Sequence, residues 1–258
     1  MQALVLNLAT STDRMAFQRR QLDRLGLSYL RIEAATPQTL DPPEGDPVWQ
    51  RWQRPMSDVE KAILVSHRLA WHRVVEADAP HLILEDDAWL SGRATDLLAR
   101  LGPMTGLDHV SLETRGRTKI IGRAPHPDCP GIRRLYQDRT GAAAYVVWPS
   151  GANKLLARSS REAGIADAVI CAAYEMSSWQ AVPALAIQLD QADHYGVSSP
   201  LITQSSILSK PKPVRETRAL TFRARRIKAQ LRMGLRMLGA LPHADRVEVA
   251  PADLSADH

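Results

Sequence analysis

Short apolar runs alternate with amphipathic segments along most of the chain. Residues 3–8 and 29–32 are apolar runs of strand length, and residues 12–25 between them follow a helical pattern. A strand, a helix and a second strand in this order predict a β-α-β unit with parallel strands. The strand ends, with Asn7 and Glu33, should then lie along one edge of a sheet, where ligands usually bind.

The same alternation continues downstream. Ser57 and Glu60 have capping-box spacing, which predicts a helix from there to about Glu76 with His67 on its inward stripe. A lone histidine on such a face is more often a satisfied core residue than a ligand. The other expected elements are helices over residues 94–101 and 151–158, strands over residues 109–112, 120–122, 132–136, 143–148 and 184–188, and loops over residues 36–55 and 123–131.

Two tryptophans, Trp49 and Trp52, stand in the expected loop over residues 36–55. Tryptophans exposed in a loop can stack on the face of a sugar. The alternative, that they anchor the loop to the core, is at least as well supported by the sequence.

The order of elements predicts one α/β domain over residues 1–208, with a Rossmann-like, mixed and mostly parallel sheet. The pattern changes after Pro211 and Pro213, where apolar residues recur at helical spacing from Leu220 to Leu238. We therefore expect a basic amphipathic helical extension over residues 209–240 and a disordered tail over residues 241–258.

A short apolar run at residues 82–84 ends abruptly in three acids, Glu85, Asp86 and Asp87. Three adjacent carboxylates cannot follow the run into the core, because burying unpaired charge is too costly, so they are expected at the end of the strand. Glu85 and Asp87 point to the same side of an extended chain, and their oxygens can converge on one hard divalent cation. The alternative is a solvated, acid-rich turn.

Composition indicates a globular protein with 45% hydrophobic and 24% charged residues. No stretch approaches the ~20 apolar residues of a membrane span, and the first residues lack the pattern of a signal peptide, so a cytoplasmic location is expected. Cys129 and Cys171 are far apart and have no CxxC spacing, which predicts neither a zinc knuckle nor a disulfide framework.

The net charge of +5 is unevenly distributed, because ten Lys or Arg residues stand against one acid between Ser209 and Met237. A basic amphipathic helix over residues 215–238 can lie on an anionic membrane, on the inner face of the cytoplasmic membrane in this case. It can equally dock on its own domain with a solvated basic face. Nucleic acid is not expected as a partner, because the segment lacks the aromatic residues of a base-stacking platform.

Five segments, in this order and spacing, resemble glycosyltransferase family 25, which includes bacterial lipopolysaccharide galactosyl- and glucosyltransferases and collagen galactosyltransferase domains. The resemblance covers roughly residues 3–207. Its segments are Val5 to Leu8 with Asp13-Arg14; Met56-Ser57 through Glu60 to Ser66-His67 and Trp71; Leu82 to Asp87; Thr140-Gly141 through Tyr145 to Lys154-Leu155-Leu156; and Val182-Pro183 to Gln188, with Ser205-Ser206-Ile207 suiting the closing segment.

The resemblance implies a GT-A-like fold and a metal-dependent, inverting transfer of galactose or glucose from a UDP-hexose to a lipopolysaccharide-core or other surface-glycan acceptor, either a glycan or a glycolipid. It also implies a Mn²⁺ or Mg²⁺ ion, with Asp87 the surest ligand, Glu85 next and His194 a possible third. The ion would neutralise the leaving diphosphate as the glycosidic bond breaks. The nucleotide-sugar side would include Asn7, Arg14, Glu33, Ser66, His67 and Asp86.

Inversion requires a base that deprotonates the acceptor hydroxyl. Asp167 is the first candidate, because it follows the helix over residues 151–158 where an acceptor wall would lie, and Glu113 is its rival. For either residue the alternative is a helix cap or a surface acid.

The chain departs from the family where a Gly-Glu-Ile-Gly-Cys segment is usual, because it has Val59-Glu60-Lys61-Ala62-Ile63 and retains only the glutamate. The substituted segment favours a helix, so the fold is expected to persist. An alternative function follows from this departure: a non-catalytic protein with the same fold that binds a sugar nucleotide or a membrane surface.

Overall fold

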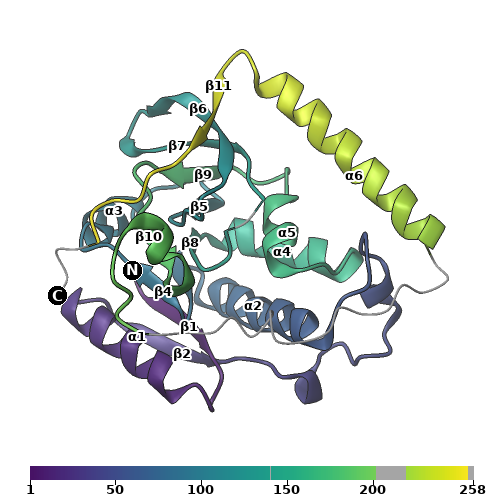
Figure 1. The fold of residues 1–258 in the computed structure, drawn as a ribbon, viewed down its shortest axis with the longest axis horizontal. Coiled ribbons are helices and arrows are strands. Elements are labelled where there is room, and N and C mark those ends of the chain that lie inside the picture. Colours follow the sequence, from purple (N-terminus) through teal and green to yellow (C-terminus); the bar gives the residue numbers. More distant parts are fainter. Residues whose placement is uncertain (140, 202–218, 255–258) are drawn as a thin grey trace.

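The computed structural model describes residues 1–139, 141–201 and 219–254. Its first unit is the expected β-α-β arrangement (Figure 1). Strand β1 (Ala3–Asn7) pairs in parallel with β2 (Tyr29–Glu33) on one side and with β3 (His81–Glu85) on the other, and α1 (Thr12–Arg24) connects β1 to β2. The three strands therefore end at the same edge.

Nine strands of the described chain form one mixed sheet in the order β11-β6-β7-β9-β5-β8-β3-β1-β2. The further strands are β5 (His109–Ser111), β6 (Thr118–His126), β7 (Cys129–Gln137), β8 (Ala144–Val147), β9 (Ser178–Ala181) and β11 (Ala244–Glu248), and β4 (Ala88–Leu90) pairs separately with β10 (Ala186–Gln188). The α/β class with a mixed sheet is confirmed. Antiparallel pairs outnumber parallel ones, five to three, because the sheet is extended by hairpins beyond its opening unit.

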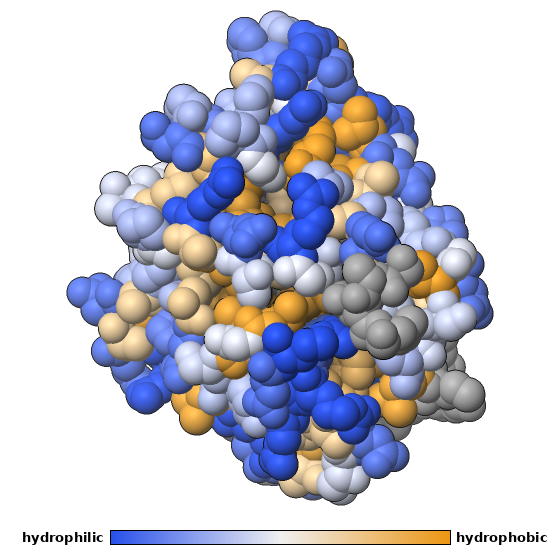
Figure 2. All heavy atoms as spheres, turned by 90° about the vertical axis from the view of Figure 1, so that its left-hand side faces the viewer, coloured by the Kyte–Doolittle hydropathy of each residue, from blue (hydrophilic) through white to orange (hydrophobic). Residues whose placement is uncertain are grey.

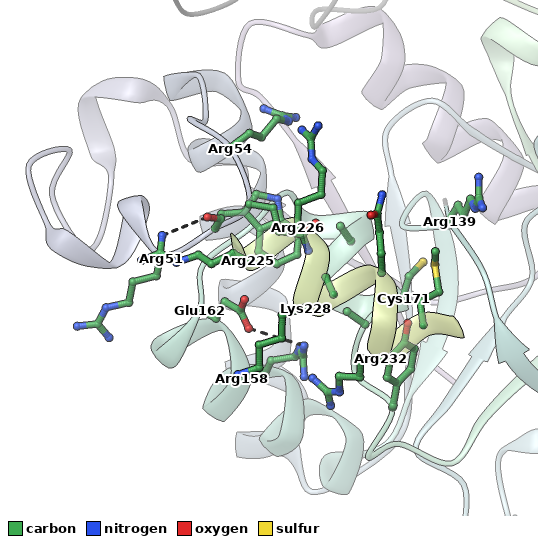
Figure 3. A pocket seen from close by; sticks show the side chains of 18 of the residues that line it. Arg51, Arg54, Arg139, Arg158, Glu162, Cys171, Arg225, Arg226, Lys228 and Arg232 are labelled. Carbon is green, nitrogen blue, oxygen red and sulfur yellow. Dashed lines mark hydrogen bonds and ion pairs between the residues drawn. The ribbon is translucent and has the colours of Figure 1, made fainter. Parts of the chain in front are cut away.

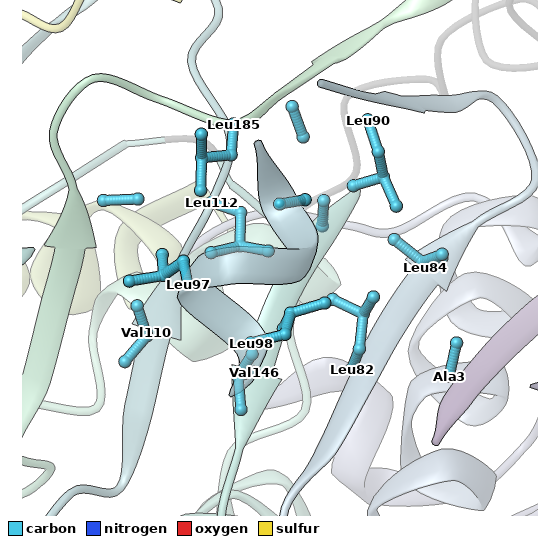
Figure 4. Close-up of a cluster of buried hydrophobic side chains, with 14 of the residues drawn as sticks. Ala3, Leu82, Leu84, Leu90, Leu97, Leu98, Val110, Leu112, Val146 and Leu185 are labelled. Carbon is cyan, nitrogen blue, oxygen red and sulfur yellow. The ribbon is translucent and has the colours of Figure 1, made fainter. Parts of the chain in front are cut away.

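Alternating side chains of the central strands bury two cores, one on each face of the sheet. On one face Val5 and Leu84 pack with α1 and with α3 (Ala94–Leu101), and Figure 4 shows Leu82 and Leu98 in this cluster. On the other face Leu6 and Ile83 pack with α2 (Asp58–Ala77), α4 (Pro149–Arg161) and α5 (Ala166–Cys171). The sheet is thus covered by helices on both faces, as its nearly continuous apolar central strands require.

Helix α2 begins with the expected capping box. The Ser57 hydroxyl accepts a hydrogen bond from the Glu60 amide at 3.3 Å, and the Glu60 carboxylate accepts one from the Ser57 amide at 2.9 Å. Arg54 pairs with the same carboxylate at 2.6 Å. Glu60, the residue of the family segment that the chain retains, therefore serves the start of the helix.

The segment over residues 36–55 contains two short 3₁₀ helices, Pro37–Thr39 and Pro47–Gln50, and its tryptophans are buried. Trp49 is 4% exposed and Trp52 is 5% exposed. Gly164 makes room for Trp52, since a Cβ at that position would lie 2.6 Å from the indole ring. The tryptophans anchor the segment to the core and present no face to a sugar.

The expected loop over residues 123–131 is wrong, because β6 and β7 form a long hairpin through it. Register shifts in the pairing near Pro125 accommodate the prolines that suggested a loop. Two 3₁₀ turns, Leu189–Gln191 and Asp193–Tyr195, follow β10.

The C-terminal segment forms helix α6 (Ala219–Ala240) and then strand β11, which pairs with β6. The helical extension is confirmed over its described residues, whereas the expected disorder after residue 240 is wrong up to residue 254. Val249, Ala252 and Leu254 are buried, which provides the physical reason for order there. The predicted closing segment Ser205 to Ile207 and the basic residues from Lys210 to Arg218 lie outside the described residues, as does Thr140.

In the described chain, no helix is long and apolar enough to cross a membrane. Hydrophilic side chains dominate the face shown in Figure 2, with apolar atoms in small patches between them. Six of the eight large apolar side chains that are exposed among the described residues instead lie on α6 or directly after it.

The close approach of α4 to the segment before β5 depends on Gly151. A Cβ added there would lie 2.2 Å from the backbone oxygen of Asp108. We expect Gly151→Ala to lower the free energy of unfolding by about 2 kcal/mol or more through this overpacking, measured by chemical denaturation. Gly234→Ala is the matched control, because nothing lies within 4 Å of its added Cβ; equal effects of the two variants would contradict the prediction.

Candidate active site

The end of β3 is held by a network centred on Asp86. Because Leu6 lies opposite Glu85 in the parallel pairing, Asn7 is brought alongside Asp86. The Asp86 carboxylate accepts hydrogen bonds from Asn7 Nδ2 at 2.8 Å and from Arg14 Nη1 at 2.9 Å. Asn7 and Asp86 are buried and bind each other, so they position the edge of the sheet. Arg14, whose side chain is 20% exposed, also lies 3.7 Å from Asp87.

Asp87 has a buried oxygen without a partner. Within the described residues its Oδ1 atom makes no hydrogen bond, and its Oδ2 atom lies 3.7 Å from Arg14 Nη1. Burial, followed by repulsion from Glu85 and Asp86, raises the pKa of Asp87 to about 7. A buried, unpartnered carboxylate oxygen is costly, and binding a cation would offset that cost.

Glu85 is oriented by a chain of hydrogen bonds from the core. Trp71 Nε1 donates to the Tyr145 hydroxyl at 2.8 Å, this hydroxyl lies 2.9 Å from His67 Nδ1, and His67 Nε2 lies 3.3 Å from Glu85 Oε1. Every group is satisfied when Tyr145 donates to His67 and His67 donates to Glu85. Gln188 donates to the other Glu85 oxygen at 3.3 Å.

Burial shifts the pKa values of both His67 and Glu85, the last two groups in this series of hydrogen bonds. His67 is completely buried, and burial lowers its pKa to about 4, so the imidazole is neutral near pH 7. Burial and the negative charge of Asp167 raise the pKa of Glu85 to about 8. His67 was predicted to face the nucleotide; the structure instead places it in the core, where its ring contacts Tyr145 and Glu85.

Asp167, at the start of α5, lies in the electrostatic field of the same acids. It is half-buried, and burial raises its pKa while His67 lowers it. Glu113 is 2% exposed, its carboxylate accepts a hydrogen bond from the Ala143 amide at 3.0 Å, and burial followed by Asp167 raises its pKa to about 8. The charges of the acids predicted from separate segments therefore act on one another. Of the two candidate bases, Asp167 is the more accessible.

A buried ion pair that sequence reasoning missed adjoins these acids. Lys119 Nζ lies 2.6 Å from Asp138, with both side chains less than 5% exposed, and it donates to the Glu113 carbonyl at 2.8 Å and to Gln180 at 2.7 Å. Lys119 lies near the start of β6 and Asp138 directly follows β7, and the pairing of these two strands through residues 123–131 was not predicted. A lone lysine beside Ile120 was the one signal available.

Arg115 was also missed. It pairs with Asp190 at 2.7 Å, and its positive charge lowers the pKa values of Glu85 and Asp167. It follows Glu113 after the end of β5, where no pattern marked it.

Three other predicted residues lie elsewhere or are already occupied. Glu33 is exposed and pairs with Arg31 at 3.3 Å. The Ser66 hydroxyl is buried, donates to the Ala62 carbonyl at 2.8 Å and accepts from the Ala35 amide at 2.9 Å. His194 is 54% exposed and lies 3.7 Å from Glu248. None of them joins Glu85 and Asp87.

The chemistry of the site fits a divalent cation held by few protein ligands. In the part of the chain that the structure describes, no group of three or more His, Cys, Asp or Glu side chains could hold a metal. The unpartnered Asp87 oxygen and the Glu85 carboxylate offer two oxygen ligands. Mg²⁺ and similar ions are commonly held by one or two carboxylates together with substrate phosphates and water, so these residues fit an ion shared with a diphosphate.

A family model described as glycosyltransferase family 25 (LPS biosynthesis protein) matches residues 1–170 of the chain. No curated protein matches the chain. Among solved structures, A197 from STIV is similar over 70% of this chain and 81% of its own, with 11% identity and a TM-score of 0.37. A glycosyltransferase involved in the glycosylation of the major capsid of PBCV-1 is similar over 61% and 65%, with 8% identity and a TM-score of 0.31.

The raised pKa of Glu113 predicts how its replacement changes stability with pH. The folded protein keeps this carboxyl protonated up to about pH 8, whereas the unfolded chain ionises it near its ordinary value. The wild type therefore loses stability from Glu113 as the pH rises from about 4 to about 8. Relative to the wild type, Glu113→Gln should become more stable by about 1 kcal/mol or more between pH 5 and pH 8.

Equilibrium denaturation at both pH values measures this difference. Comparing variant with wild type removes the opposite contribution of the buried histidines, whose lowered pKa values favour folding as the pH rises. Glu76→Gln is the control, since that side chain is 64% exposed. A difference between Glu113→Gln and the wild type that stays constant with pH would refute the assignment.

Proposed function

The chain belongs to glycosyltransferase family 25, and from this membership we propose that it transfers a hexose from a UDP-sugar to a glycan acceptor. The observation that carries the proposal is the unpartnered oxygen of Asp87, next to Glu85 and Arg14 at the edge where β1 and β3 end. The family model is described as an LPS biosynthesis protein, which supports a lipopolysaccharide-core or other surface-glycan acceptor.

The donor diphosphate would lie against Arg14, whose guanidinium donates to phosphate oxygens. Asp87 and Glu85 would hold Mn²⁺ or Mg²⁺, and the bound ion would neutralise negative charge on the leaving diphosphate. Both carboxylates must lose their protons to bind an ion, so ion binding should strengthen as the pH rises toward 8.

Asp167 would act as the base. It would take the proton of the acceptor hydroxyl while that oxygen bonds to the anomeric carbon of the hexose. The acceptor oxygen attacks from the face opposite the leaving group, the bond from the anomeric carbon to the β-phosphate oxygen breaks, and UDP leaves with the electron pair, so the configuration inverts. The raised pKa of Asp167 makes it a stronger base than an ordinary aspartate. His67, through its contact with Glu85, is a positioning residue.

Donor binding tests the proposal directly. Thermal unfolding with a panel of UDP-, GDP- and CMP-sugars, with and without Mn²⁺, should show stabilisation by a UDP-hexose that requires the ion. Asp87→Asn should lose the ion-dependent part of the shift, because it removes a charged ligand without changing the side-chain shape.

Asp23→Asn is the matched control, since it changes an exposed aspartate on α1. Stabilisation of the wild type that is equal with and without Mn²⁺ would count against the role of Asp87. If none of the nucleotide sugars shifts the unfolding temperature, a non-catalytic protein with this fold is favoured.

We also propose that α6 contacts an anionic membrane. Its inner face docks on the domain, with Arg236 Nε donating to the Tyr136 carbonyl at 2.7 Å. Its opposite stripe stays exposed: Leu231 by 64%, Leu235 by 71% and Leu238 by 64%. Arg223 and Lys228 of the same helix are also exposed, so a second copy of the helix would be repelled, whereas anionic lipid complements both the charge and the apolar stripe.

Vesicle sedimentation tests this contact. Replacing Leu231, Leu235 and Leu238 together by Gln should weaken binding to vesicles rich in phosphatidylglycerol by about tenfold or more, because each exposed leucine loses its burial in lipid. Leu69→Gln is the control, since Leu69 is 44% exposed on α2. Equal binding of the triple variant and the wild type to the anionic vesicles would contradict the proposal. So would equal binding of the wild type to anionic vesicles and to neutral phosphatidylcholine vesicles.

A further inference from the structure

A large cavity lies between α6, α4, α5 and the segment over residues 51–54. Its volume is about 1030 Å³, at the upper end of the range for small-molecule sites. Figure 3 shows side chains of α6, among them Arg226 and Lys228, across from Arg54 and Arg158. Helix α6, which was predicted as a helical extension of the domain, therefore forms one wall of this cavity.

The lining is strongly basic. Nine Lys or Arg residues line the cavity against three acids. The described residues include no carboxylate partner within ion-pair distance for six of these cations: Arg51, Arg139, Arg161, Arg225, Arg226 and Lys228. Such a concentration of unpaired positive charge raises the local concentration of anions.

The contacts of Arg158, Arg225 and Arg232 give the wall its shape. Arg158 lies 3.2 Å from Glu175, and Arg232 lies 3.9 Å from the same residue and 5.2 Å from the centre of the Tyr174 ring. Arg225 donates to the backbone oxygens of Gln50 and Trp52, which fastens α6 to the segment beside it. The cavity is thus built by specific contacts between α6 and the domain.

The cavity lies beside the helix that carries the proposed base, and Ala168, the residue after Asp167, lines it. Asp138 and Cys171 line it. Cys171 ends the short helix α5, which has Asp167 in its first turn. Asp138 pairs with Lys119, and its charge acts on the pKa of Asp167. The donor side, with Arg14 and Asp87, lies at the ends of β1 and β3 instead. Asp167 therefore belongs to a helix of the cavity wall, and its charge also acts on Glu85 at the donor edge.

We propose that this cavity binds the acceptor, and that the acceptor is an anionic glycan carrying phosphate or carboxylate groups. The inference rests on the proposed function and specifies its substrate class. The unpaired cations bind the acidic groups, while one hydroxyl of the glycan reaches Asp167. The basic helix α6 is then part of the acceptor site, and its outer stripe is a separate surface.

The same chemistry has a second source, because the diphosphate of the nucleotide is also anionic. Two titrations by calorimetry separate the sources. One uses a lipopolysaccharide core oligosaccharide, either intact or with its phosphates removed and its carboxyl groups reduced. The other uses UDP with Mn²⁺. Neither titration requires turnover, so both give a result even if the protein proves inactive as a transferase.

The variant replaces Arg139, Arg226 and Lys228 by Gln. All three side chains are exposed, so the substitutions leave the core intact. The control replaces Arg19, Arg20 and Arg100 by Gln, which removes the same charge from exposed positions outside the cavity. We expect the cavity variant to bind the intact oligosaccharide about tenfold or more weakly than the wild type, since charge-assisted hydrogen bonds are lost. The control variant should bind it like the wild type.

Three results would overturn the inference. Equal loss in the cavity and control variants would indicate general charge attraction. Equal binding of the intact and neutralised oligosaccharides by the wild type would remove the role of the acidic groups. Loss of UDP affinity, with oligosaccharide affinity retained, would assign the cavity to the nucleotide. If the wild type binds the intact oligosaccharide through the cavity but binds no UDP-sugar, the proposed function fails while the anion site stands.

Discussion

The hydrogen bonds from Asn7 and Arg14 to Asp86 fix the end of β3, and the arrangement of the site follows from them. They satisfy the middle of three consecutive acids inside the protein. Its neighbours Glu85 and Asp87 are thereby directed away from that network, at the edge of the sheet. Carboxylates so close together and so poorly hydrated repel each other, which explains why their pKa values rise.

Several acids of raised pKa at one site ionise only when positive charge is nearby, either a bound cation or basic side chains of the protein. Arg14 and Arg115 supply part of it at the strand ends, and Lys119 supplies part of it from the core. The cavity beneath α6, whose wall includes α5, is lined by further Lys and Arg residues.

Local patterns predicted the parts of the structure that depend on neighbouring residues. The capping box of Ser57 and Glu60, the opening β-α-β unit and the acid-ended strand are all encoded within a few residues of one another, and the structure has them. The stripe from Leu220 to Leu238 likewise predicted a helix. Asp167 and Glu113 were also predicted from the sequence as candidate bases. Only the structure could show that they share one electrostatic environment with Glu85.

Long-range pairings could not be predicted in this way. The pair of Lys119 and Asp138 depends on how β6 and β7 pair across the expected loop over residues 123–131, which local patterns do not specify. Residues 244–254 are ordered because β11 pairs with β6, a partner more than a hundred positions earlier. His194 suggested a metal ligand by residue type alone, and the structure places it beside Glu248. Whether α6 forms the wall of a cavity depends on what it packs against, which its own stripe does not specify.

The most direct test of the central claim is the release of UDP from UDP-galactose and UDP-glucose by the purified protein in the presence of Mn²⁺. If Glu85 and Asp87 hold the ion at the leaving diphosphate, UDP should form from one of these donors, and its release should require both the ion and Asp87. Absence of UDP release from either donor, or equal release by the wild type and Asp87→Asn, would contradict the account.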